Sequence, residues 1–256
     1  MMKRLLLPLA MAAACAAAPA QTLGLRLILV GDSTMAPRSG YGNALCERLP
    51  LLACLNLARG GRSSKSYRAE GLWNSVTTLL REGGQKDLVL IQFGHNDQPG
   101  KPGRSTDLAT EFPPNLAAYV DEVRAAGGTP VLLTPLTRRS FKAGQLQNDL
   151  GPWADAIRKV AADKGVQVLD LNALSAAAVQ AMGEDEADTL ALAPKPAALA
   201  PVPTDPNQVE PQGQPKSLFD RTHVGPKGAA LFADIVLKEL LKLRPELQAA
   251  TGARAQ

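Results

Sequence analysis

Aromatic residues and histidines are scarce in this chain of 256 residues. Phe, Trp and Tyr make up 4% of it, so we expect a core built mainly from Ala, Leu and Val. Histidine occurs only at His95 and His223, which leaves two candidates for a histidine general base. After residue 20, no segment reaches the ~18 uncharged apolar residues of a membrane-spanning helix, so no membrane span is expected. Apolar residues at 45% and charged residues at 20% are typical of a globular domain.

The start of the chain has the pattern of a secretory signal peptide. The basic pair Lys3-Arg4 precedes an apolar stretch over residues 5–18, and Ala-Pro-Ala at 18–20 has the spacing of a cleavage site. We therefore expect residues 1–20 to be a leader and the mature protein to be exported, to the periplasm or the medium. Without Lys3 and Arg4, 26 of the 28 basic residues remain against 24 acidic residues, a balance that gives no indication of nucleic-acid binding.

The three cysteines bear on two questions. Cys15 lies in the leader and would permit a lipid anchor, but Ala12 stands where a lipobox usually carries Leu, so we expect no anchor. Cys46 and Cys54 remain in the mature chain, and an oxidising compartment permits a bridge between them. Two separate buried thiols are the alternative, because sequence alone does not test the Cβ geometry that a bridge requires.

Apolar, β-rich runs alternate with helical patterns along the mature chain. Strands are expected at residues 26–30, 53–58, 88–93, 130–134 and 166–171. Helices are expected at residues 44–49, 67–81, 116–126, 150–164, 172–182 and 228–243. Glycines at 127, 128 and 165 stand where helices commonly end. This alternation predicts a parallel sheet covered by helices on both faces, in one domain over residues 21–248.

Residues 183–215 interrupt the alternation with a Pro- and Ala-rich segment that has no helical or strand periodicity. We expect a disordered surface excursion there. A lid is the alternative, since the segment ends shortly before Asp220. Residues 249–256 are expected to be a frayed tail.

Ser33 is a candidate nucleophile because of where it stands. It lies in Gly-Asp-Ser-Thr at 31–34, directly after the first expected strand and before a helical segment. Open α/β folds place their sites at this carboxyl edge of the sheet, where the following helix also presents its positive end. The alternative is a serine that only caps the helix.

A serine nucleophile needs a neighbouring base, and His223 is the better placed of the two histidines. It stands three positions after Asp220, in a loop before the last helix. In a turn, this spacing allows the carboxylate to bind one imidazole nitrogen and leaves the other for Ser33. The alternative is a loop whose Asp caps the helix.

Two further strand ends carry groups that could stabilise an oxyanion. Gly61 follows the second strand, and its backbone N–H can approach a substrate closely. Asn96 follows the third strand and supplies a side-chain amide. Alone, these residues would be interpreted as a loop glycine and an Asx turn. Three consecutive strands that each end in a nucleophile or a donor favour acyl transfer.

The four motifs resemble, in order and in context, the blocks of the SGNH (GDSL-type) hydrolases. Within that superfamily, GDSTM, ARGGRSSKSY, QFGHND and DRTHVGPKGA are similar to the rhamnogalacturonan acetylesterases, carbohydrate esterase family 12. The motifs extend from Ser33 to His223 and so cover most of the mature chain.

The resemblance implies that Ser33 is the nucleophile and that Asp220 and His223 complete a catalytic triad. It implies an oxyanion hole made of the Ser33 and Gly61 N–H groups and the Asn96 side chain. It also implies a flavodoxin-like, three-layer α/β/α sandwich with about five parallel strands, and no metal or organic cofactor.

The expected activity is removal of O-acetyl groups from an acetylated polysaccharide or oligosaccharide, with acetylated rhamnogalacturonan (pectin) as the substrate. The same residues could serve another acyl ester, such as acetylated xylan or a short-chain lipid. A catalytically silent carbohydrate-binding protein on the same scaffold is the alternative from another class.

Candidate substrate contacts are Arg62, Tyr67 and His95. Arg62 belongs to a basic cluster near Gly61 that would attract uronate carboxylates, unless it is a solvated helix start. Tyr67 offers a flat face to a sugar ring, although core packing is the more frequent role of such rings. His95 is expected to support the site rather than to act in catalysis. Two histidines without ligand-pair spacing give little support to a metal site.

Overall fold

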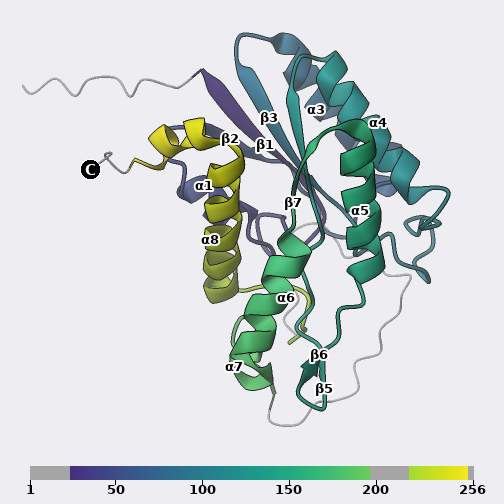
Figure 1. Ribbon diagram of the computed structural model, residues 1–256, viewed down its shortest axis with the longest axis vertical. Helices are drawn as coiled ribbons and strands as arrows, with labels where there is room; N and C mark the ends of the chain where they lie inside the picture. Colours follow the sequence, from purple (N-terminus) through teal and green to yellow (C-terminus); the bar gives the residue numbers. More distant parts are fainter. Residues whose placement is uncertain (1–23, 197–218, 253–256) are drawn as a thin grey trace, which may run out of the picture.

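The computed structural model describes residues 24–196 and 219–252 (Figure 1). Its centre is a five-stranded parallel sheet with the order β2-β1-β3-β4-β7, which confirms the expected strand number and direction. The strands are β1 (Leu25–Gly31), β2 (Ala53–Asn56), β3 (Lys86–Gln92), β4 (Thr129–Leu133) and β7 (Gln167–Leu169). The expected signal peptide, residues 1–20, lies outside the described residues.

Helices cover both faces of the sheet, as the alternation predicted (Figure 1). One layer consists of α1 (Gly42–Glu47), α6 (Leu171–Met182) and α8 (Pro226–Leu243). The other consists of α3 (Leu72–Glu82), α4 (Phe112–Ala125) and α5 (Gly151–Lys164). Along β1, Leu27 and Leu29 face the first layer, whereas Ile28 and Val30 face the second. This alternation buries both faces of the strand from Leu27 to Val30 and explains why these four residues are all apolar.

The few aromatic residues gather mainly in the second layer. Tyr67 packs edge-on against Phe93, whose ring stacks on Tyr119, and Trp73 meets Tyr119 edge-on. The first layer is built largely from Leu, Val and Ala. The expected aliphatic core therefore describes one side of the sheet better than the other.

Two of the expected elements and connections differ in the structure. The helix expected at 67–81 is divided into α2 (Ser66–Ala69) and α3, because the chain turns at Gly71 with a φ of 75°. A hairpin of β5 (Phe141–Lys142) and β6 (Gln145–Leu146) was not anticipated, since each strand has only two residues. Among the described residues, no helix has the length and apolar character needed to span a membrane.

The expectation of an irregular excursion over 183–215 is wrong for its first part. Helix α7 (Glu184–Asp188) forms there, and Ala187 and Leu190 are buried in the core. Ala191 also makes an antiparallel bridge with Val224, next to the expected base. These contacts lie between residues distant in sequence, which local periodicity does not register. Residues 197–218 lie outside the described part of the chain, so the choice between a lid and a disordered segment is not tested there.

The expectation of a frayed tail over residues 249–256 is wrong for its first residues. A 3₁₀ helix, η1 (Pro245–Thr251), continues past residue 248 and buries Ala250 completely. The carbonyl of Ala250 accepts a hydrogen bond from the Leu51 N–H. This contact with the segment after α1 fixes the end of the domain.

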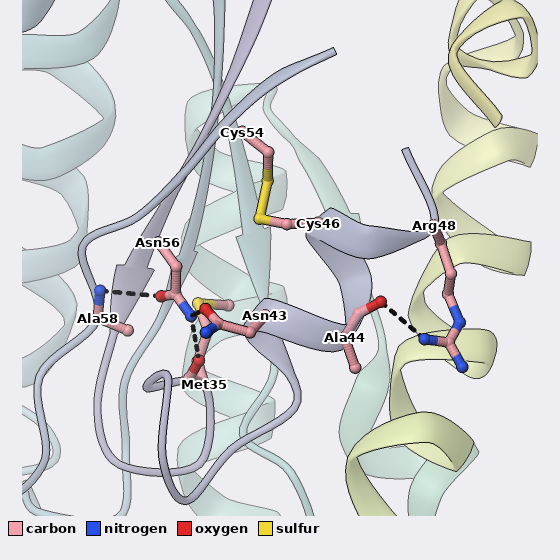
Figure 2. The surroundings of a disulfide bond; sticks show 8 residues. All are labelled: Met35, Asn43, Ala44, Cys46, Arg48, Cys54, Asn56 and Ala58. Carbon is pink, nitrogen blue, oxygen red and sulfur yellow. Dashed lines mark hydrogen bonds between the residues drawn. A yellow bond between two sulfur atoms is a disulfide. The ribbon is translucent and has the colours of Figure 1, made fainter. Parts of the chain in front are cut away.

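Cys46 and Cys54 form a disulfide, which decides between the two alternatives for these thiols (Figure 2). Their Cα atoms are 5.5 Å apart, within the range for bridged cysteines. The bond joins the end of α1 to the edge strand β2. Near it, the Asn56 amide donates to the Met35 carbonyl at 3.0 Å and so attaches β2 to the loop after Ser33.

Candidate active site

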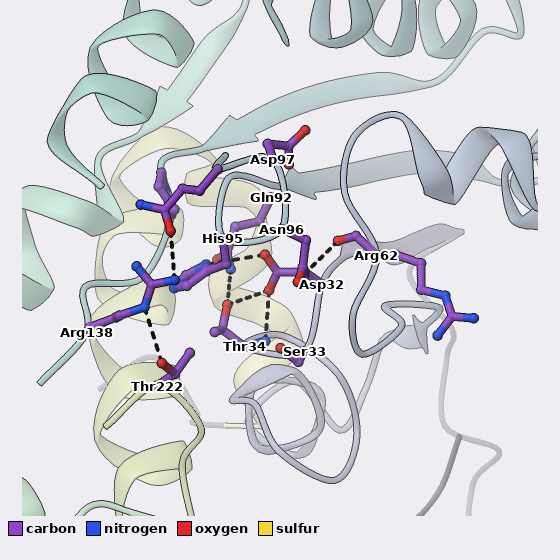
Figure 3. Close-up of polar contacts among 12 residues, drawn as sticks. Asp32, Ser33, Thr34, Arg62, Gln92, His95, Asn96, Asp97, Arg138 and Thr222 are labelled. Atoms are coloured by element: carbon purple, nitrogen blue, oxygen red, sulfur yellow. Dashed lines mark hydrogen bonds and ion pairs between the residues drawn. The ribbon is translucent and has the colours of Figure 1, made fainter. Parts of the chain in front are cut away.

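The sequence motifs meet at the carboxyl edge of the sheet. Ser33 follows β1, Gly61 lies in the loop after β2, and Asn96 follows β3. His223 lies just before α8, in a loop that contacts the segment after β4. Figure 3 shows the turn of Ser33, the loop of Asn96 and the side chains around them. In an open parallel sheet, this edge is where ligand sites are built.

The turn that carries Ser33 is held by its neighbours (Figure 3). The Asp32 carboxylate accepts hydrogen bonds from the N–H and the hydroxyl of Thr34, both at 2.8 Å. The Thr34 hydroxyl in turn accepts one from the Gln92 amide of β3 at 2.7 Å. Ser33 is 8% exposed, at the rim of this buried network. The network therefore fixes the backbone on both sides of the serine.

Asp220 and His223 form the pair that their spacing predicted. Asp220 Oδ2 lies 2.9 Å from His223 Nδ1, and Asp220 Oδ1 accepts the N–H groups of Thr222 and His223 at 2.7 Å. Burial raises the pKa of Asp220. The side-chain hydrogen bond and the charge of His223, together with the two N–H donors, act more strongly in the opposite direction and lower this pKa to about 2. Asp220 is therefore a carboxylate at neutral pH. It binds Nδ1 and leaves Nε2 to face other groups.

Ser39 links the turn of Ser33 to the loop of His223. The Ser39 hydroxyl donates to the Ser33 carbonyl at 2.8 Å, and the Ser39 carbonyl accepts the Val224 N–H at 2.9 Å. Within the described residues, Ser33 and His223 make no direct hydrogen bond. Catalytic hydrogen bonds are often long in the absence of substrate. The triad therefore stays a prediction, supported by this shared contact.

The two expected oxyanion donors lie in neighbouring loops. Gly61 has a φ of 76°, a conformation that favours glycine, and a Cβ atom at Gly60 would lie 3.7 Å from the Ser33 Cβ. The Asn96 Nδ2 donates to the Arg62 carbonyl at 3.0 Å, so one of its two hydrogens is used and the other is available. Asn96 thereby attaches its own loop to the glycine loop beside Ser33.

Two residues that sequence reasoning missed hold these loops in place. The Arg104 guanidinium lies 3.5 Å from Asn96 Oδ1, which orients the amide with its nitrogen toward Arg62. Asp97 is fully buried and accepts the Ser64 hydroxyl at 2.6 Å. Burial raises the pKa of Asp97 to about 6, although the Ser64 bonds act in the opposite direction. Asp97 is visible in the GHND motif, whereas no sequence signal indicates Arg104.

His95 lies beneath the site and not in it. It is 3% exposed, and its Nδ1 lies 3.3 Å from the fully buried Asp32 carboxylate. Burial lowers the pKa of His95, and Asp32 opposes this shift only in part, so the imidazole is neutral at pH 7. This burial argues against the substrate contact expected for His95 and fits the expectation that it supports the site, here through Asp32 in the turn of Ser33.

The other expected substrate contacts differ in exposure. Tyr67 is 1% exposed and donates its hydroxyl to the Leu57 carbonyl, so its ring is part of the core and not a platform for a sugar. That expectation is wrong because the ring is needed against Phe93. Arg62 remains near the site, where it binds the Gly60 carbonyl at 2.7 Å and Glu70 at 2.7 Å. Its charge is therefore partly balanced.

The two histidines lie apart from each other, each beside an aspartate. His95 pairs with Asp32, and His223 pairs with Asp220, in separate elements. Over residues 24–196 and 219–252, no three His, Cys, Asp or Glu side chains form a group that could hold a metal ion. The arrangement is instead a hydroxyl, an imidazole held by a carboxylate, and amide donors at one sheet edge. This set is suited to acyl transfer.

Comparison with solved structures supports the fold. An Axe2 variant, an acetylxylan esterase from Geobacillus stearothermophilus, superimposes with a TM-score of 0.57 at 16% identity, covering 90% of this chain and 97% of its own. The protein YXIM from Bacillus subtilis gives a TM-score of 0.65 at 22% identity, covering 85% of this chain and 56% of its own. Together with the parallel sheet, these similarities confirm the three-layer α/β/α sandwich.

Sequence comparison identifies the family. The chain is 32% identical to the rhamnogalacturonan acetylesterase RhgT of Bacillus subtilis, with 86% of this chain and 90% of that protein covered. It is 25% identical to a rhamnogalacturonan acetylesterase of Emericella nidulans, with 84% of each chain covered. The model of the GDSL-like lipase/acylhydrolase family matches residues 29–231, which include all four motifs. The chain therefore belongs to the GDSL-like lipase/acylhydrolase family and is a carboxylic ester hydrolase.

Proposed function

We propose that this enzyme removes O-acetyl groups from a carbohydrate, with acetylated rhamnogalacturonan as its substrate. The observation that carries the proposal is the Asp220–His223 pair at the sheet edge that also bears Ser33 and Asn96. Two relatives matched over most of their length, from Bacillus subtilis and Emericella nidulans, are rhamnogalacturonan acetylesterases, which supports the choice of substrate.

The reaction would begin with transfer of the Ser33 hydroxyl proton to His223 Nε2 as the serine oxygen attacks the acetyl carbonyl. The Ser33 and Gly61 N–H groups and the Asn96 amide would donate to the oxyanion. His223 would then protonate the sugar oxygen as it departs and leave an acetyl-serine. Water deprotonated by His223 would release acetate and restore the serine.

Asp220 has two tasks in this scheme. It orients the imidazole through Nδ1, and it stabilises the imidazolium that forms when His223 takes a proton. Its pKa of about 2 keeps it ionised throughout, so the proton stays on the imidazole.

Two arginines near Asn96 favour an acidic polymer as the substrate. Arg62 and Arg104 both contact this residue, one through its carbonyl and the other through its guanidinium. These two cations, of which Arg62 is paired with Glu70, add positive potential beside Asn96 that would attract the uronate carboxylates of rhamnogalacturonan. Acetylated xylan, the substrate of the Geobacillus enzyme, is the second candidate because that enzyme shares the fold.

We also propose export to the periplasm or the medium. The basic and apolar pattern of residues 1–20 supports it, and so does the Cys46–Cys54 disulfide, because such bonds persist in oxidising compartments.

The test is acetate release from acetylated rhamnogalacturonan, acetylated xylan and a short-chain lipid ester, measured in parallel with the Ser33→Ala variant as control. We expect the highest kcat/KM on rhamnogalacturonan and none with the variant. A higher kcat/KM on xylan would replace the substrate but keep the chemistry. Acetate release by Ser33→Ala at the wild-type rate would reject the mechanism, and no release from any ester would favour a silent binding protein.

A further inference from the structure

Arg139 is the largest side chain among those that the described fold buries completely. It stands after β4, on the segment that runs beside the loop of Asp220 and His223. A fully buried arginine is uncommon, since its charge loses water on folding. Its position next to the site therefore calls for a specific role.

Within residues 24–196 and 219–252, the hydrogen bonds that Arg139 donates go to one loop, and its Nε has no partner. Its Nη2 donates to the carbonyls of Asp220 at 2.9 Å and His223 at 2.8 Å, and its Nη1 lies 3.5 Å from the Thr222 carbonyl. Its backbone N–H donates to the Arg221 carbonyl at 2.8 Å. Arg139 thus donates to the carbonyls of four consecutive residues, 220–223, which include both members of the Asp220–His223 pair.

These contacts complement those made by Asp220. The Asp220 carboxylate takes the N–H groups of Thr222 and His223 from within the loop, while Arg139 takes the carbonyls. The N–H groups of Thr222 and His223 and the carbonyls of Asp220 and His223 are therefore bound by charged side chains. The direction in which the His223 ring points follows from this backbone, because both side chains of the pair start from it.

The charged groups around Arg139 explain why its guanidinium is tolerated. Burial lowers the pKa of Arg139 to about 10, and the nearby carboxylates of Asp220 and Asp188 oppose that shift. The charge of Arg221 lowers the pKa of Arg139 further, and Arg221 is itself paired with Asp188 and Glu184. At neutral pH Arg139 remains a cation, which makes its hydrogen bonds to carbonyls stronger than those of a neutral donor.

We propose that Arg139 is a positioning residue that fixes the Asp220–His223 pair in the geometry required for proton transfer from Ser33. The proposal rests on the proposed function, in which His223 is the base. The planar guanidinium reaches several carbonyls at once, which the single ammonium of a lysine does not do. Its loss would displace the imidazole, and a displacement of about 1 Å can cost about 10²-fold in rate.

The test is Arg139→Lys, assayed on a small acetyl ester over a range of pH. We expect kcat to fall about 10²-fold with KM nearly unchanged, because the base and not the substrate site is disturbed. We also expect the acid limb of kcat/KM to move to lower pH, since a misaligned Asp220 carboxylate stabilises the imidazolium less well. Should this variant fold poorly, Arg139→Gln, which keeps N–H donors without the charge, serves for the same measurements.

Arg26→Met is the matched control. Arg26 is also mostly buried, but it binds Asp87 at the opposite edge of the sheet, at the beginning of β1. This variant should lose thermal stability and keep the wild-type kcat and pH profile. A kcat and pH profile of Arg139→Lys that match those of Arg26→Met would overturn the proposal.

His223→Ala separates this inference from the proposed function. If His223→Ala retains wild-type activity, the proposed base is wrong and the positioning role falls with it. If His223→Ala is inactive while Arg139→Lys has the kcat and pH profile of the wild type, only the inference about Arg139 is wrong.

Discussion

The two histidines of this chain each contact an aspartate, and the two pairs differ in almost everything else. His95 and Asp32 lie 3.3 Å apart with side chains 3% and 0% exposed. His223 and Asp220 lie 2.9 Å apart with side chains 13% and 25% exposed. An Asp–His contact is therefore not enough to make a base. Access from the surface distinguishes the pair that we propose as the acceptor of the Ser33 hydroxyl proton.

The protonation states follow the same division. The buried pair combines a neutral His95 with an Asp32 whose pKa is lowered, burial being outweighed by His95 and by the bonds from Thr34. It serves as a fixed acceptor for the nucleophile turn. The Asp220 carboxylate instead holds an imidazole at the edge of the fold, in a loop that other elements position.

The largest effect is expected from removing the accessible imidazole. His223→Ala should lower kcat by about 10⁴-fold or more on a small acetyl ester, because the serine then lacks its base. Circular dichroism and the melting temperature should stay close to those of the wild type. Ser33→Ala is the matched variant and should lose a similar amount. Retention of more than a tenth of wild-type kcat by His223→Ala would remove the distinction between the two pairs.

Asp220→Asn should have the next largest effect. The amide keeps the shape of the carboxylate but supports the wrong imidazole tautomer, and the expected loss of kcat is about 10³- to 10⁴-fold at neutral pH. Asp32→Asn, measured alongside, should affect stability more than kcat. Equal losses of kcat in both variants would show that the buried pair also takes part in proton transfer.

Asn96→Ala should lower turnover by about 10²- to 10³-fold, with little change in the fold, because one oxyanion donor is lost. The measurement is kcat on the same ester. An unchanged kcat would return Asn96 to a role in joining its loop to the Arg62 carbonyl.

His95→Gln tests the role of the buried pair. It leaves the buried Asp32 without its imidazole neighbour, so we expect a loss of about 1–3 kcal/mol in the free energy of unfolding. The kcat should fall by no more than about tenfold, since Ser33 and His223 are untouched. Denaturant unfolding and kcat measured on one preparation decide this. A loss of kcat as large as that of His223→Ala would contradict the supporting role.

The smallest effect is confined to acid pH. The folded-state pKa of Asp220 is about 2 and its ordinary value is 3.8, so ionisation of Asp220 favours the folded state. This contribution, up to about 2 kcal/mol, is complete above pH ~4 and is lost as pH falls through about 2. Asp220→Asn should lack that part of the acid dependence of unfolding. An identical dependence in both proteins would contradict the shift.

Much of the fold was predictable from local patterns. The five strands and most helices begin and end within a few residues of the expected positions, because alternation and helical periodicity record which side of an element is buried. The short β5–β6 hairpin and α7 were missed, since two to five residues carry too little periodicity to register.

The sequence by itself determined the order of the motifs and the type of chemistry that they carry. Ser33, Asn96, Asp220 and His223 were all named from strand ends and spacing, and the Asp220–His223 contact follows from a turn of four residues. Local spacing fixes such features because they depend on neighbours in the chain.

Only the tertiary structure decided which histidine is buried, whether Cys46 and Cys54 bond, and that the Tyr67 ring belongs to the core. The same holds for Arg139, whose partners lie more than 80 positions away. Burial and long-range hydrogen bonds arise where elements distant in sequence pack together. No periodicity within a single element records those contacts.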